Sequence, residues 1–154
     1  MDYTHYWTIH YGKKDLNLAT FRELGFYVES IIEISTYPVA NWRGEGMPEI
    51  LNDYIGLNGY GEDSFETLRL DRLYAGNLDL TGSGSIDDSC KTGRMPYDEI
   101  VTATLLICKH LFRDQIELTS DGTPDDWDSG YALAQQVIED VIKPKDALKG
   151  EVSP

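Results

Sequence analysis

The chain is poor in the residues that hold metals and disulfides. Its 154 residues include only two cysteines, Cys90 and Cys108, and three histidines. Small secreted domains that depend on disulfides carry more cysteines at regular spacing, so these two are expected to be reduced thiols. The metal-binding patterns CxxC, HxxxH and HExxH do not occur, and the sequence therefore predicts neither a metal site nor another cofactor.

Long apolar runs are also missing. No stretch of about 18 apolar residues occurs, so no membrane-spanning helix is expected. The first five residues, MDYTH, lack the basic and apolar segments of a secretory signal, so no leader is expected. Together with the reduced thiols, this predicts a cytoplasmic protein with no membrane partner.

Positive charge is scarce. Thirteen Lys and Arg stand against 27 Asp and Glu, a formal net charge of −14, which argues against direct nucleic-acid binding because the phosphate backbone demands cations. Much of the negative charge falls in residues 45–71 and 114–128. Two interpretations stay open: the acids keep the protein in solution, or they imitate nucleic acid and bind a basic groove of another protein.

The residues that are present favour one folded domain. Hydrophobic residues make up 41% of the chain, and ten are tyrosines, which is enough to build a core at this length. In residues 3–11, alternation places Tyr3, His5, Trp7, Ile9 and Tyr11 on one face of a strand, which we expect to be the buried face.

Periodicity and turn residues predict the remaining elements. They are a helix over 19–35, a loop over 38–49, a hairpin with arms 54–58 and 65–70, a long loop with room for a short strand over 75–89, a helix over 97–112, a strand over 115–120, and a last helix that begins at Pro124 and ends before Lys143-Pro144. This order predicts an α+β fold, a single-domain two-layer sandwich over residues 1–144. Its sheet would be antiparallel or mixed and covered by about three helices, with 145–154 as a flexible tail.

The start of the second long helix combines several reactive or charged residues in "CKTGRMPYDE". Pro96 suits the first helical position, and acids favour the positive end of the helix dipole. Lys91 and Arg94 lie just before it, so they either bind an anion at the helix start or neutralise nearby acids. Cys90, beside Lys91, is either a buried inert thiol or a nucleophile with a lowered pKa.

Three further polar residues are candidates for ligand contacts because of their predicted positions. Glu66 is predicted to share a strand face with Leu68 and Leu70, so a core position there would require a cation such as Lys91 or Arg94. Asn58 and Asp121 each precede a glycine. Both are interpreted first as turn residues and second as ligand contacts.

Four groups of residues also form a pattern known from other chains. They are Tyr3-Thr4-His5-Tyr6-Trp7; Asn58-Gly59 with Phe65-Glu66-Thr67-Leu68; Cys90-Lys91-Thr92 with Pro96-Tyr97-Asp98; and Ser120-Asp121-Gly122 with Trp127 and Gly130. Together they resemble an uncharacterised family of proteins from bacteria and their phages, notably phages of actinobacteria. Leu68 and Gly93 depart from the family pattern, in which Phe and Ala are expected. The resemblance implies a small accessory protein of a phage or mobile element in the bacterial cytoplasm, where action against host defence is one such role.

From the residues, the favoured hypothesis is a non-catalytic protein that binds a small anionic, nucleotide-like ligand. Aromatic side chains of the first strand would stack on the ligand, and the helix start would hold its phosphate or carboxylate. The predicted ligand-binding residues are Asn58, Glu66, Lys91, Thr92, Arg94, Tyr97 and Asp121. The alternatives are an acidic inhibitor of a basic host protein and an enzyme that uses Cys90 or the carboxylates of Glu66, Asp98 and Asp121.

Overall fold

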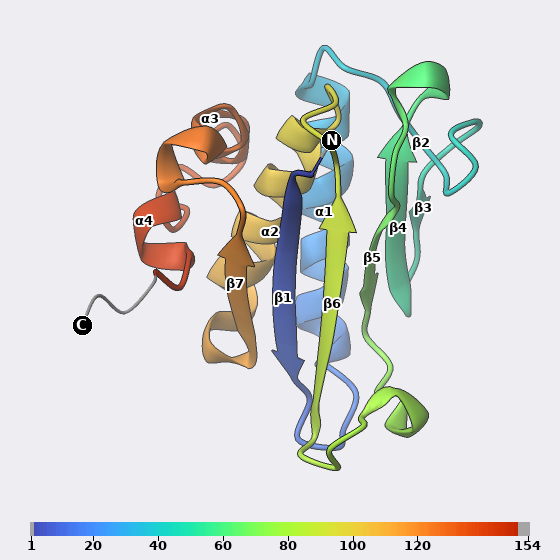
Figure 1. Cartoon of the computed structure of the whole chain (residues 1–154), viewed down its shortest axis with the longest axis vertical. Helices are drawn as coiled ribbons and strands as arrows, with labels where there is room; N and C mark the ends of the chain where they lie inside the picture. The colour runs from blue at the N-terminus through green and yellow to red at the C-terminus, as the bar shows by residue number, and fades with distance from the viewer. Residues whose placement is uncertain (1, 151–154) are drawn as a thin grey trace.

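Strands form one layer of the molecule and two long helices form the other. The computed structural model describes residues 2–150, and in Figure 1 the helices α1 (Leu18–Ile34) and α2 (Asp98–Phe112) lie behind the strands. Every strand pairing is antiparallel. The predicted two-layer α+β fold is confirmed.

The first sheet has β1 (Thr4–His10) at its centre. It pairs with β6 (Ser85–Lys91) on one side and with β7 (Ile116–Ser120) on the other. The register sets His5 opposite Cys90 in β6 and opposite Ser120 in β7. A shift of one residue would turn every side chain of β1 to the other face, so this register places His5 inside the molecule between two distant segments.

The second sheet is built on β4 (Tyr54–Gly59). It pairs with β2 (Val39–Ala40), β3 (Glu49–Ile50) and β5 (Leu68–Asp71). In Figure 1, β5 runs beside β6, so the two sheets meet along these two strands. The two strands belong to different sheets, so no ladder of main-chain hydrogen bonds continues from β5 to β6.

One core lies between the strand layer and the helices. Both sheets and both long helices contribute to it, with buried side chains that include Trp7, Ile9, Phe21, Leu24, Ile55, Leu57, Leu105, Leu106, Leu118 and Trp127. The five residues predicted to face inward from the first strand, Tyr3 to Tyr11 at alternate positions, are all buried. Alternation was a sound guide there because β1 is central and one of its faces lies on the helices.

The predicted last helix is wrong in its length. Thr123 caps its start through a capping box with Asp126, but a 3₁₀ turn comes first and α3 spans only Asp128–Gln135. The chain then continues in turns, and a second short helix, α4 (Pro144–Ala147), follows. Tertiary packing overrides the periodic pattern here, because these turns bury Ile138 and Val141 against the core.

Strand β6 lies where a long loop was predicted over 75–89. Its sequence, SIDDSCK, has few apolar residues, so neither alternation nor β propensity marks it as a strand. It forms because its main chain pairs with β1 along its whole length. Similarly, β2 and the first residue of β3 fall in the predicted loop 38–49, and β5 begins at Leu68 rather than at Phe65.

The interpretation of 145–154 as a flexible tail also differs from the structure. Residues 144–147 form α4, and Leu148 makes a parallel bridge to Leu118 of β7. Lys149 N donates to Leu118 O at 2.8 Å. The segment thus extends the edge of the first sheet, while residues 151–154 lie outside the described residues.

Candidate functional site

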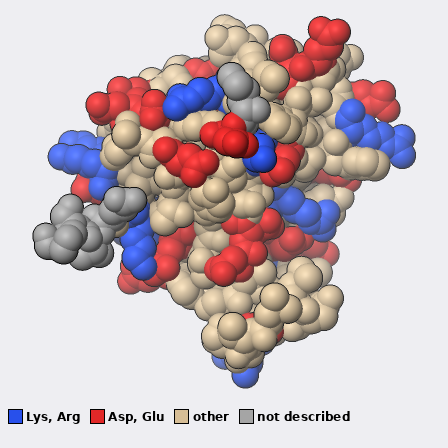
Figure 2. Space-filling view, in the orientation of Figure 1, with Lys and Arg blue, Asp and Glu red and all other residues tan. Residues whose placement is uncertain are grey.

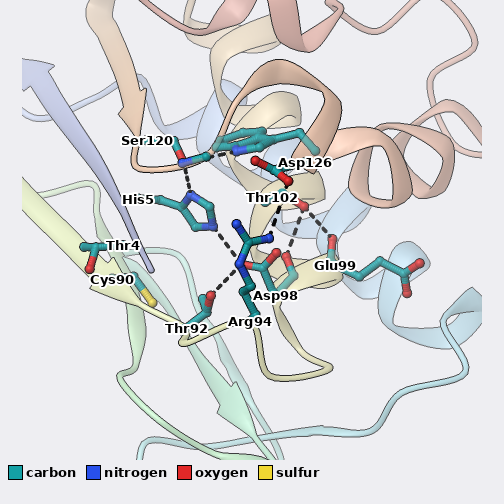
Figure 3. A network of polar contacts seen from close by, with 12 residues as sticks. Thr4, His5, Cys90, Thr92, Arg94, Asp98, Glu99, Thr102, Ser120 and Asp126 are labelled. Atoms are coloured by element: carbon teal, nitrogen blue, oxygen red, sulfur yellow. Dashed lines mark hydrogen bonds and ion pairs between the residues drawn. The ribbon is translucent and has the colours of Figure 1, made fainter. Parts of the chain in front are cut away.

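A chain of polar side chains crosses the interior where β1, β7 and α2 meet (Figure 3). His5 stands at its centre and is fully buried. Its Nδ1 lies 2.8 Å from Ser120 Oγ, and its Nε2 lies 2.7 Å from Asp98 Oδ1. Because Asp98 and Ser120 lie far from His5 in the sequence, only the fold brings them together.

Further hydrogen bonds complete this network. Thr92 Oγ1 donates to Asp98 Oδ1 at 2.5 Å. The Ser120 oxygen accepts from Gly122 N at 2.9 Å and from Trp127 Nε1 at 3.3 Å. Thr92, Asp98, Ser120 and Trp127 all come from the motifs that carry the family resemblance, and the structure joins them through His5.

The order serine, histidine, carboxylate is also that of hydrolytic triads. An ionised carboxylate can only accept, so Nε2 of His5 donates to Asp98. Ser120 Oγ is held by His5 Nδ1, Gly122 N and Trp127 Nε1. The imidazole is fully buried between its two partners, and the role seen in these contacts is to tie β1, β7 and α2 together.

Arg94 lies in a tight turn at the edge of this network. Gly93 and Arg94 both have left-handed backbone, with φ of 60° and 62°. Glycine is the residue that adopts this conformation most readily, so Gly93 suits this turn. The turn aims the Arg94 guanidinium over the ring of Tyr3, 3.9 Å from its centroid, with NH1 3.4 Å from Asp126 Oδ1.

The start of α2 offers little free hydrogen-bonding capacity. Asp98 N donates to Met95 O at 2.9 Å and Ile100 N donates to Tyr97 O at 3.0 Å. Lys91 Nζ lies 3.6 Å from Asp2 Oδ1. Of the two interpretations of the cations before the helix, neutralisation of nearby acids is the one seen in these contacts.

Glu66 does not occupy the core face that was predicted for it. The residue precedes β5 and is exposed, because the strand starts two residues later. Its Oε1 accepts from Lys91 N at 2.8 Å, and its carbonyl oxygen accepts from Tyr97 Oη at 2.5 Å. Glu66 therefore links the second sheet to the end of β6, with main-chain atoms of Lys91 as its partner in place of a side-chain cation.

The remaining predicted residues are engaged in turns. Asn58 is buried, and its amide bonds Gly59 N at 2.7 Å, Phe65 N at 2.9 Å and Phe65 O at 3.0 Å. Asp121 Oδ2 accepts from Thr4 N at 3.1 Å. Their preferred interpretation as turn residues fits these bonds.

The structure thus brings Glu66, Lys91 and Tyr97 together, with Asn58 beside them through its bonds to Phe65, while Asp121 bonds Thr4 of β1. Arg94 lines a surface hollow of about 280 Å³ beside Asp98 and Glu99. Partial burial raises the pKa of Glu99, and a hollow with two acids and one cation is a poor place for an anion. Binding of an anionic ligand by the seven residues stays a prediction.

Both thiols are expected to be unreactive in the folded protein. Cys90 and Cys108 are buried; desolvation raises the pKa of Cys90 and raises that of Cys108 to about 12. Since the thiolate is the reactive form, we expect alkylation by iodoacetamide at pH 7.5 to be about 100-fold slower in the native protein than in guanidinium chloride. Rapid native labelling that Cys90→Ser abolishes would instead support a nucleophilic Cys90.

A cleft between the two sheets is the site that the sequence did not predict. The segment just before β5 is joined to the end of β6, where Glu66 N donates to Lys91 O at 3.1 Å. Away from this junction a cleft of about 260 Å³ opens between them. It is lined by Trp7, Ile9 and Tyr11 of β1, Arg69, Asp71 and Leu73 at β5, Ala75 and Leu78, and Ile86, Asp87 and Asp88 of β6.

The one cationic side chain that lines this cleft, Arg69, already contacts an acid and an aromatic ring. Arg69 Nε lies 3.0 Å from Asp71 Oδ1, and the guanidinium lies 4.0 Å from the ring centroid of Tyr54. Arg69 therefore neutralises Asp71 and leaves the two aspartates of β6 as the excess charge of the lining.

Neither of these two aspartates forms an ion pair within residues 2–150. Asp87 Oδ1 accepts from Thr8 Oγ1 at 2.6 Å, and Asp88 Oδ1 accepts from the neighbouring Ser89 N at 2.7 Å. Partial desolvation raises the pKa of Asp88, although the positive charge of Arg69 in the same lining tends to lower it. Among residues 2–150, no Lys, Arg or His lies within 4.0 Å of either carboxylate, so the charged lining of the cleft is negative.

No protein family, curated protein or solved structure that we compared with this chain matches it. Over residues 2–150, no helix has the length and apolar character needed to span a membrane. The same residues contain no group of three or more His, Cys, Asp or Glu arranged to hold a metal ion. Figure 2 shows acidic side chains interspersed with basic ones on the face that Figure 1 presents.

Proposed function

We propose that the protein is a non-catalytic binding protein whose ligand is a small organic cation, held in the cleft between β5 and β6. The observation that carries this proposal is the pair of exposed carboxylates, Asp87 and Asp88, which border the cleft without an ion-pair partner among residues 2–150, while Arg69 of the same lining is paired with Asp71. Neighbouring carboxylates that are not ion-paired leave a local excess of negative charge, which a positive group can compensate. A cationic ligand supplies that group.

The other lining residues indicate the size and the apolar part of the ligand. Trp7 and Tyr11 line the cleft with the small part of their surface that is exposed, 3% and 6%, and aromatic rings attract both flat apolar groups and cations. A volume of about 260 Å³ lies just below the range of drug-sized pockets. An amine or guanidine that carries a short apolar or aromatic body fits this combination.

This proposal keeps part of the sequence-based hypothesis and changes another part. The first strand was predicted to supply aromatic side chains to a pocket, and Trp7 and Tyr11 line this cleft. The ligand charge is reversed, since acids rather than Lys91 and Arg94 border it. Action in a phage or mobile element against host defence rests on the family resemblance and stays a prediction.

A thermal-shift panel tests the proposal. Tyramine, agmatine and spermidine represent organic cations, and AMP, ATP and citrate represent anions. We expect at least one amine to raise the melting temperature by about 2–4 °C at saturating concentration, since ligand binding to the native state stabilises it. Its affinity should fall as the pH is lowered through the raised pKa of Asp88, because a neutral carboxyl does not attract a cation.

Matched variants separate the cleft from the general acidity of the chain. The double variant Asp87→Asn/Asp88→Asn should weaken amine binding at least tenfold, whereas Glu139→Gln/Asp140→Asn, which changes two exposed acids away from the cleft, should leave it unchanged. If AMP or ATP raises the melting temperature and the amines do not, the proposal of a cationic ligand is wrong. That result would support the prediction of an anionic ligand. Equal losses in both double variants would also contradict a site in the cleft.

A further inference from the structure

A second hollow, on another face, has a different chemistry. It lies between α1 and the segment around β3, with a volume of about 560 Å³. Its lining residues are Glu29, Ile32 and Glu33 of α1 and Met47, Pro48, Glu49, Ile50 and Leu51. We call it the α1–β3 groove. It shares no residue with the cleft between β5 and β6.

The groove exposes large apolar side chains that the core does not use. Met47 is 81% exposed and Leu51 is 52% exposed. The inner face of α1 already buries Phe21, Leu24, Val28 and Ile31. Isolated exposed apolar residues are common, but a group of them around one hollow marks a contact surface.

The walls of the groove are held firmly. A Cβ added at Gly25 of α1 would lie 3.1 Å from Ile50 Cγ2, so α1 and β3 are packed close together beneath the groove. Glu49 Oε2 accepts from Tyr54 Oη at 2.5 Å, which fixes one rim side chain against β4. A preformed surface loses little conformational entropy when a partner binds.

All charges on the rim have the same sign. Glu29, Glu33 and Glu49 line the groove without a Lys or Arg among its residues. Over residues 2–150, no cationic side chain approaches these three carboxylates within 4.0 Å. The groove thus combines an apolar floor with an uncompensated negative rim.

This charge pattern selects among the possible occupants. A symmetric dimer through the groove would bring the same glutamates of two copies face to face, and like charges in an interface cost several kcal/mol. An anionic membrane surface would be repelled for the same reason. We propose that the groove docks a segment of another protein that presents large apolar side chains flanked by Lys or Arg.

Synthetic peptides provide the probe. The first is a 14-residue peptide with two leucines four positions apart among lysines and alanines. The second replaces both leucines by serine, and the third replaces the lysines by glutamate. In ¹⁵N–¹H spectra of the labelled protein, we expect the first peptide to shift signals of residues 26–33 and 47–51, and the other two to bind at least tenfold more weakly.

Variants of exposed residues localise the contact. Met47→Ser/Leu51→Ser and Glu29→Lys/Glu33→Lys should each reduce binding of the first peptide at least tenfold, with unchanged melting temperatures. Glu139→Lys/Asp140→Lys makes the same charge change away from the groove. In 0.15 M salt, which screens general electrostatic attraction, this variant should change the affinity for the first peptide less than twofold.

Four results would overturn the proposal. Equal binding of the leucine and serine peptides would mean that charge alone attracts them. Equal losses in the two charge-reversal variants would place the contact outside the groove. Concentration-dependent dimerisation of the wild-type protein, abolished by Met47→Ser/Leu51→Ser, would identify a second copy as the occupant. Absence of any shift in residues 26–33 and 47–51 would contradict docking there altogether.

Discussion

Replacing His5 by alanine is expected to lower the free energy of unfolding by about 4 kcal/mol, a large part of the stability of a domain of this size. His5 is fully buried and bonds Asp98 and Ser120 at once. Its removal leaves a cavity and takes one partner from each of these residues. An Asp98 carboxylate that is 16% exposed regains only part of its lost hydrogen bonding from water.

His10 provides the matched control on the same strand. Its side chain is 40% exposed and bonds Ser85 Oγ at 2.7 Å on the open face of the sheet. We expect His10→Ala to cost at most about 1 kcal/mol, because water can replace this bond. Urea unfolding followed by circular dichroism measures both variants. Equal effects of the two substitutions would show that the network adds nothing to stability.

Gly130→Ala is expected to destabilise the protein by about 3 kcal/mol or more, because the added methyl group has no room. Gly130 lies in α3 where this helix crosses α2. Its Cβ would overlap Thr102 Oγ1 and would lie 2.8 Å from Thr102 Cβ and 3.0 Å from Ala103 N. Since backbone atoms of α2 cannot give way cheaply, the two helices would have to separate.

Two further variants test this steric explanation by thermal unfolding. Gly76→Ala adds the same methyl group where the nearest atom, Tyr74 Cε2, lies 3.7 Å away, and should change stability by less than about 0.5 kcal/mol. Combining Gly130→Ala with Thr102→Ala removes the overlapping hydroxyl. The double variant should therefore be more stable than the sum of the single effects predicts, by about 1 kcal/mol. Strict additivity would point to a cause other than the contact with Thr102.

Part of the fold was predictable because local patterns and tertiary packing agree. The helix expected over 97–112 is α2, but residues 100–108 are buried all round and not on one apolar face alone, because α1, α3 and β7 all pack against this helix. The first strand buries the face that alternation indicated. β6 was not predictable, since two aspartates and two serines in SIDDSCK give no apolar signal, and its strand geometry comes from pairing with β1 alone.

The candidate sites also contain a part that the sequence predicted and a part that only the structure shows. The motif residues Thr92, Asp98 and Ser120 could be found in the sequence, but their meeting at His5 depends on the register of β1 with β6 and β7. Glu66 was assigned to a core face because the start of β5 was placed too early. The cleft at Asp87 and Asp88 was missed because the segment that carries them was interpreted as a loop.

By itself, the sequence determined the α+β class, the amphipathic faces of β1 and α1, and a second long helix that begins shortly after Pro96, because each depends on neighbours within a few residues. Only the tertiary structure decided the rest. It paired a polar segment with β1, ended α3 early, placed His5 between Ser120 and Asp98, and opened an acidic cleft between two sheet edges. These features arise from contacts between residues far apart in the chain. No local sequence pattern indicates which distant residue a buried histidine or an aspartate will contact.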